Sequence, residues 1–154
     1  MFEVAAKKEI LTDYEDFVSK SSTKKKKKGG SKQKNVTQDT IAKSVNKWYY
    51  IGSDPTRNEL IKSLCDHLEL KGLKAKIGCI PAILVQGKFP IEVIKYASER
   101  DVFELLGRML WINEQYRSVI GVLQGIEDPD EAEEIEQSCK GLFLDEEKAI
   151  LILV

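Results

Sequence analysis

The chain has 154 residues, 42% of them hydrophobic and 32% charged, which suffices for one compact core with a short appendage. Its longest apolar run, residues 149–154, is far shorter than the roughly 20 residues that a membrane helix needs. The N-terminal residues include acids where a signal peptide has its apolar region, which favours an intracellular protein, cytoplasmic or within a nucleoprotein particle. We expect no membrane partner.

The first segment, residues 1–19, has the apolar spacing of a short amphipathic helix. An isolated helix of this length is marginal in water, so its apolar stripe is expected to dock on the rest of the chain or on a neighbouring copy. We therefore expect Ile10, Tyr14 and Phe17 to lie in a protein interface.

A Lys-rich linker, residues 20–35, follows this helix. Eight lysines and no acid lie between Lys20 and Lys34, while the rest of the chain has 16 basic residues against 25 acidic ones, a formal charge of about −9. Such a like-charge block repels itself and is typical of an interaction segment. The lysines expected to contact nucleic acid or an acidic neighbour are Lys24, Lys25, Lys26, Lys27, Lys28, Lys32 and Lys34.

Residues 36–154 are expected to form one compact α+β domain, in which helices dominate and pack on a small sheet. Ile41 and Trp48 fit one face of a first helix. Thr56 and Glu59 have capping-box spacing at the start of a second helix, and Gly72 stands where a left-handed C-terminal cap is common.

After these helices the apolar period changes from 3.6 to 2. Residues 73–79 predict a half-buried strand and residues 82–85 a buried one, with Pro81 at a bend, bulge or edge. Pro90 is expected to open a helix, whose apolar residues are Ile91, Ile94 and Tyr96.

The C-terminal third is expected to be mainly helical. Helical spacing over residues 102–123 predicts one long core helix, capped by Ser98 or Asp101. An acidic helix is expected after Pro129, with Gly141 as its cap. Residues 142–144 and 149–154 are then expected to form a small β element.

The sequence contains no recognisable catalytic, metal or cofactor motif, and we expect a protein that is not an enzyme. His67, the single histidine, would point about 200° away from Cys65 on a helix, so the two cannot form a nucleophile and base. Three cysteines, odd in number and widely spaced, argue against a disulfide framework and a zinc site. We expect all three, Cys65, Cys79 and Cys139, to be packed thiols.

Two further features are candidates for binding. The run from Glu127 to Glu136 has seven acids and no base, which is typical of a solvated helix face but also permits pairing with the Lys-rich linker, so that Glu131 and Glu134 are candidate interface residues. Tyr49 and Tyr50 follow Trp48, which is expected in the core, and either tyrosine could stack on an unpaired base.

These features favour a non-catalytic structural or adaptor subunit of a larger assembly, such as a nucleoprotein or virus-like particle. The Lys-rich linker would contact nucleic acid or an acidic neighbour, and protein partners, including other copies, are expected. One alternative is a free-standing RNA- or DNA-binding regulator, against which the acidic body is an objection because it repels phosphates. Another is an assembly chaperone or inhibitor of one protein partner.

Overall fold

A computed structural model describes residues 35–140 and 149–154. The expected helix over 1–19, with Ile10, Tyr14 and Phe17, and the lysines of residues 20–34 lie outside the described residues. The described helices are α2 (Gln38–Asn46), α3 (Arg57–Leu70), α4 (Glu99–Tyr116) and α5 (Pro129–Cys139), and the strands are β1 (Ala75–Ile77), β2 (Ile83–Val85), β3 (Phe89–Lys95), β4 (Val119–Gln124) and β5 (Ala149–Leu153).

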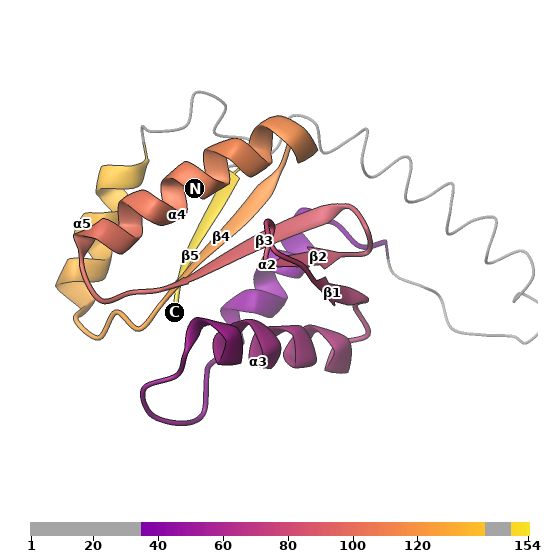
Figure 1. Ribbon diagram of the computed structural model, residues 1–154, viewed down its shortest axis with the longest axis horizontal. Helices are drawn as coiled ribbons and strands as arrows, with labels where there is room; N and C mark the ends of the chain where they lie inside the picture. The colour runs from indigo at the N-terminus through magenta and orange to yellow at the C-terminus, as the bar shows by residue number, and fades with distance from the viewer. Residues whose placement is uncertain (1–34, 141–148) are drawn as a thin grey trace, which may run out of the picture.

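The strands form one mixed five-stranded sheet in the order β1-β2-β3-β4-β5. β1, β2 and β3 are antiparallel neighbours, whereas β3, β4 and β5 run parallel. Helices cover both faces: α2 and α3 share one apolar core with the sheet, and α4 and α5 share the other (Figure 1). The α+β class is confirmed, and the expected small sheet has five strands, two of which, β3 and β4, lie where helix was predicted.

The helix predicted to open at Pro90 is wrong, because residues Phe89–Lys95 form strand β3. Six of its seven residues are buried, because β3 lies inside the sheet with helices on both sides. Ile91 and Val93 face the core of α2 and α3, while Ile94 faces that of α4 and α5. A strand that is apolar on both faces also satisfies a helical spacing, and this ambiguity caused the error.

The predicted helix over residues 102–123 is two elements. α4 ends at Tyr116, where Arg117 adopts a left-handed conformation with φ 59° and its N–H donates to the carbonyl of Asn113 at 2.8 Å. β4 then begins at Val119, and it is buried on both faces up to Leu123. Because the residues of β4 are almost all apolar, they also fit helical spacing, and the predicted helix therefore continued past Tyr116.

Several local predictions are confirmed. Thr56 and Glu59 form the capping box of α3, and Gly72 has φ +82° just after it. α5 begins at Pro129, although its predicted cap at Gly141 lies outside the described residues. Residues 149–153 are a strand, but the partner is β4 in parallel. The predicted strand at 142–144 cannot be compared, since it also lies outside the described residues.

Other predictions hold only in part. The strand predicted over residues 73–79 shortens to β1, whose Ile77 is 49% exposed. Cys65 and Cys139 are buried thiols, but Cys79 is exposed, so its assignment to the core was wrong. Cys79 lies two residues after the end of β1, in the turn that leads to β2. Within the described ranges, no helix has both the length and the hydropathy to cross a membrane.

Candidate functional site

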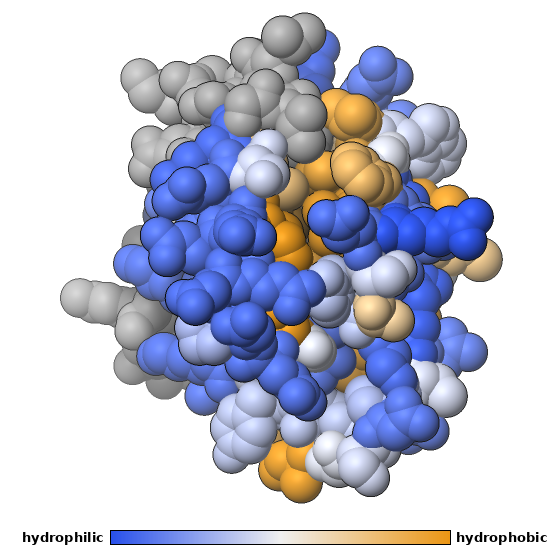
Figure 2. All heavy atoms as spheres, turned by 90° about the vertical axis from the view of Figure 1, so that its left-hand side faces the viewer, coloured by the Kyte–Doolittle hydropathy of each residue, from blue (hydrophilic) through white to orange (hydrophobic). Residues whose placement is uncertain are grey.

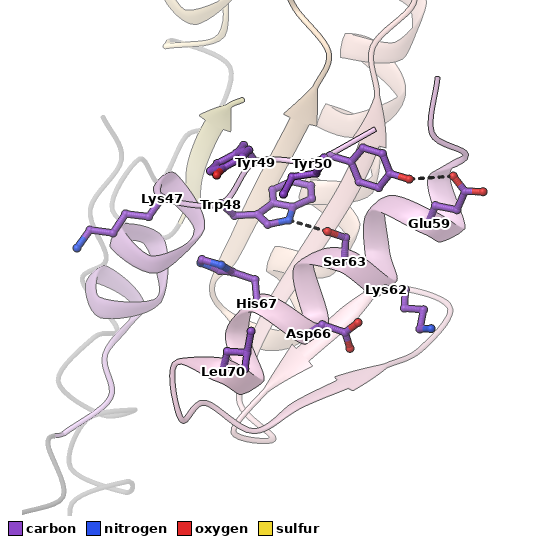
Figure 3. Close-up of a pocket in the computed structure, with 11 residues that line it drawn as sticks. Lys47, Trp48, Tyr49, Tyr50, Glu59, Lys62, Ser63, Asp66, His67 and Leu70 are labelled. Carbon is purple, nitrogen blue, oxygen red and sulfur yellow. Dashed lines mark hydrogen bonds between the residues drawn. The ribbon is translucent and has the colours of Figure 1, made fainter. Parts of the chain in front are cut away.

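The main candidate site is a groove between the end of α2 and the outer side of α3, with a volume of about 550 Å³ (Figure 3). One wall is the segment 47–51 that follows α2, and the other is the face of α3 from Glu59 to Leu70. The two walls come together because α2 and α3 pack side by side on the same face of the sheet. We call this site the α2–α3 groove.

Trp48 and Tyr50 form the fixed part of the groove. The Trp48 indole is 4% exposed, as predicted, and its N–H donates to Oγ of Ser63 at 3.1 Å. The Tyr50 hydroxyl lies 3.2 Å from Oε2 of Glu59, the capping residue of α3. Burial raises the pKa of the Tyr50 phenol, and the hydrogen bond to Glu59 raises it further. Tyr50 is therefore held by its own chain and is poorly placed to stack on a ligand.

The rim of the groove is apolar and exposed. Tyr49, Ile51 and Leu70 are 72%, 81% and 87% exposed. Exposed apolar side chains gathered around a hollow are more typical of an interaction site than the same side chains scattered singly. Tyr49 is thus the tyrosine of the predicted pair that remains available for stacking.

The sequence reasoning missed Ile51 and Leu70. Leu70 lies two residues after Leu68, which is buried in the core, and this spacing turns it to the far side of α3. Ile51 lies two residues after Tyr49 in the irregular segment that follows α2, and both are exposed, whereas Trp48 is buried. These offsets from the core stripe were the signals that could have identified both residues.

Charges in the groove are balanced and its polar groups are mostly engaged. Lys47 and Lys62 carry positive charge, and Glu59 and Asp66 carry negative charge. His67 is turned toward α2, where its Nε2 lies 2.9 Å from the carbonyl oxygen of Ser44. The groove thus offers apolar contact and stacking more than attraction for phosphate.

His67 and Cys65 point in different directions, as the sequence predicted. The Cys65 thiol donates to the carbonyl of Ala75 in β1 at 3.4 Å, on the buried side of α3. Burial raises the pKa of this thiol, which disfavours the nucleophilic thiolate. Among the described residues, no group of three or more His, Cys, Asp or Glu side chains could hold a metal ion.

A second polar cluster surrounds Glu92, which is fully buried in β3. Its Oε2 lies 2.8 Å from Nη1 of Arg108 in α4 and 3.2 Å from Nη2 of Arg57 in α3, and its Oε1 accepts from the N–H of Ala82 at 2.9 Å. Arg57 also donates to the carbonyl of Val93. Both oxygens of the carboxylate have hydrogen-bond donors, and two arginines balance its charge. We therefore interpret this cluster as a structural link between β3, α3 and α4.

The acidic helix α5 forms a hydrophilic side of the molecule. Figure 2 looks onto this side, where hydrophilic residues dominate and apolar ones appear in a narrow band between them. Glu134 is exposed, whereas Glu131 is half-buried and accepts a hydrogen bond from the Tyr96 hydroxyl. This bond is the main reason that the pKa of Tyr96 rises to about 12. Of the two candidate residues, Glu134 is the more available for contact.

No protein-family model, no curated protein and no solved structure matches this chain. The geometry of the described residues is therefore the guide to its function.

Proposed function

We propose that this chain is a non-catalytic adaptor subunit of a larger assembly. Its folded domain contacts protein through the α2–α3 groove, and its Lys-rich linker contacts nucleic acid or an acidic neighbour. The observation that carries the proposal is the apolar rim of the groove, where Tyr49, Ile51 and Leu70 are largely exposed. Apolar surface of this kind is stabilised by a partner that removes it from water.

The charge distribution supports a division of roles between linker and domain. Eight lysines are concentrated in residues 20–34, and about nine net negative charges belong to the rest of the chain. A polyanion is attracted by the linker and repelled by the domain, so the linker is the part suited to nucleic acid. The domain is suited to protein, because its groove carries two lysines balanced by two acids.

An acidic neighbour is the other candidate for the linker. Most acids of residues 127–136 are exposed on α5, and they could pair with the linker of the same chain or of another copy. If the pairing is between copies, a purified protein free of nucleic acid would self-associate at low salt and dissociate at high salt.

A free-standing RNA- or DNA-binding regulator is the second candidate function. It is favoured by Tyr49, which is 72% exposed beside Lys47 and could stack on an unpaired base. Lysines contact phosphates without reading sequence, so a regulator would need Tyr49 or a similar group to discriminate bases. A chaperone or inhibitor of one protein partner is a third candidate, and it would use the groove without the linker.

Isolation of the tagged full-length protein from its native cell, with and without nuclease, tests the proposal. An adaptor should retain protein partners after nuclease treatment, and a Leu70→Ser, Ile51→Ser variant should lose them. A Lys71→Ser variant, altered at an exposed residue next to α3 but outside the groove, is the matched control. If every partner disappears with nuclease while Tyr49→Ala abolishes nucleic-acid binding, the regulator function replaces the adaptor.

A further inference from the structure

The outer side of α4 is a second exposed apolar surface, on the opposite face of the sheet from the α2–α3 groove. Phe103, Leu110 and Trp111 are 69%, 47% and 51% exposed, while the inner side of the same helix is buried against β3 and β4. One helix therefore carries two apolar sides. The inner side accounts for the fold, and the outer side is left without a role in it.

Gly107 lies at the centre of the outer side. With 3.6 residues per turn, positions three, four and seven residues away lie on the same side of a helix. A Cβ at Gly107 would meet nothing within 4 Å, so the described chain has no steric need for glycine there. Glycine destabilises a helix interior relative to alanine, but it lets another backbone approach closely. We call this surface the α4 stripe; its residues are Arg100, Phe103, Gly107, Leu110, Trp111 and Glu114.

The α4 stripe is complementary to itself when two helices are antiparallel. If a two-fold axis passes through Gly107, each residue faces the one at the same distance on the other side of Gly107. Phe103 then faces Trp111 of the second copy, and Arg100 faces Glu114 of the second copy. Leu110 faces Glu104 of the second copy, whose carboxylate is already paired with Arg108 of its own helix, so the complementarity rests on the two other pairs. Each contact occurs twice, as an isologous interface requires. In a parallel pair, Arg100 would face Arg100 and Glu114 would face Glu114, which is unfavourable.

We propose that the α4 stripe is the contact surface for a second copy of this chain, with the two α4 helices antiparallel and crossing at Gly107. Arg100 and Glu114 are exposed, and neither forms an ion pair with any other residue in ranges 35–140 and 149–154, so both are available to the second copy. An unrelated partner would not require this inverted repetition of charge and aromatic residues. The inference depends on α4 alone and not on the proposed adaptor function.

The expected dimer is weak and reversible. Stable interfaces bury about 1,200–2,000 Å² in total, and one pair of crossing helices falls at the low end of this range. Aromatic residues near the centre carry most of the binding energy at such interfaces, so Trp111 should matter more than the charged pairs at the ends of the stripe.

Sedimentation of the purified full-length protein over a range of micromolar concentrations tests the proposal. We expect a monomer–dimer equilibrium that Trp111→Ala weakens by roughly thirtyfold or more. Arg100→Glu and Glu114→Arg should each weaken it on the order of tenfold, because each sets like charges opposite one another twice. Arg100→Glu combined with Glu114→Arg should restore the dimer, since the pairs form again with exchanged signs.

The matched control is Ile77→Ala, which shortens a similarly exposed apolar side chain of β1, outside both the α4 stripe and the α2–α3 groove, and should leave the dimer unchanged. Circular dichroism and thermal melting of every variant show whether it remains folded. A chain that stays monomeric at the highest concentrations overturns the proposal, as does a dimer in which the combined charge exchange fails to restore affinity. If deletion of residues 1–34 converts a monomer into a dimer, the N-terminal segment occupies the stripe and the proposal is likewise wrong.

Discussion

Glu92 and Arg108 form the most buried ion pair among the described residues, with Oε2 of Glu92 2.8 Å from Nη1 of Arg108. Glu92 is fully buried, whereas the side chain of Arg108 is 28% exposed. The hydrogen bond to Glu92 is the main cause that raises the pKa of Arg108. The pair joins β3 to α4, and Arg57 joins the same carboxylate to α3, so helices from both faces of the sheet meet at one residue.

The first prediction concerns this carboxylate. Removal of one partner from a buried ion pair costs about 3–5 kcal/mol of folding stability, and Glu92→Gln should lie near the lower end because both arginines keep partial access to water. Glu104→Gln is the control, since Glu104 is 46% exposed and bonds the same Arg108. It should change stability by less than about 1 kcal/mol. Urea denaturation measures both, and equal losses would mean that Glu92 is not a structural link.

The second prediction concerns close packing between Gly121 of β4 and Met109 of α4. A Cβ at Gly121 would overlap the Met109 side chain, so Gly121→Ala should destabilise the fold by about 1–3 kcal/mol. In a Met109→Ala background the same substitution should cost almost nothing, because the space is then free. Full additivity of the two substitutions would contradict the packing.

The third prediction concerns Gly107, where substitution by alanine should increase folding stability rather than reduce it. It lies in α4 with open space around its missing side chain, so Gly107→Ala should stabilise the monomer by about 0.5–1 kcal/mol through better helix propensity. Thermal unfolding at a concentration too low for dimerisation measures this gain. A loss of stability would show that Gly107 is required by the fold itself.

The fourth prediction concerns alkaline pH. The hydrogen bond to Glu131, followed by burial, raises the pKa of Tyr96 from 10.0 to about 12, so the folded chain holds this proton more tightly than the unfolded chain. The stabilising effect is fully present below pH 10 and is lost as the pH rises toward 12. In an absorbance titration one tyrosine should ionise near pH 12, and Tyr96→Phe should remove that step. An unchanged titration would rule out the bond to Glu131.

The last prediction concerns the Lys-rich linker. With about four phosphates engaged, affinity for a nucleic acid should fall on the order of a hundredfold between about 50 and 200 mM salt, since each phosphate adds about 0.9 to the slope. Replacement of residues 24–28 by serine should weaken binding and flatten this dependence without unfolding the domain. The control replaces Lys71, Lys74 and Lys76, which are exposed on the domain. Binding that does not respond to salt would exclude phosphate contacts.

Local signals in the sequence determined much of the domain. The capping box at Thr56 and Glu59, the turn at Gly72 and the start of α5 at Pro129 were predictable, because each depends on backbone groups only a few residues apart. Trp48 was correctly placed in the core for the same reason, since it continues the apolar face of α2. The basic linker and the acidic run are also properties of sequence alone.

Only the tertiary structure decided where buried strands replace helices and which apolar residues remain exposed. β3 and β4 lie inside the sheet with helices on both faces, so apolar residues occupy both faces of each strand and the period of two that marks a strand disappears. The spacing of Val102, Leu105 and Met109 indicated which side of α4 is buried, and Trp111 lies off that stripe. Only the structure shows that Trp111 stays half exposed on the other side, because burial depends on neighbours that are distant in sequence.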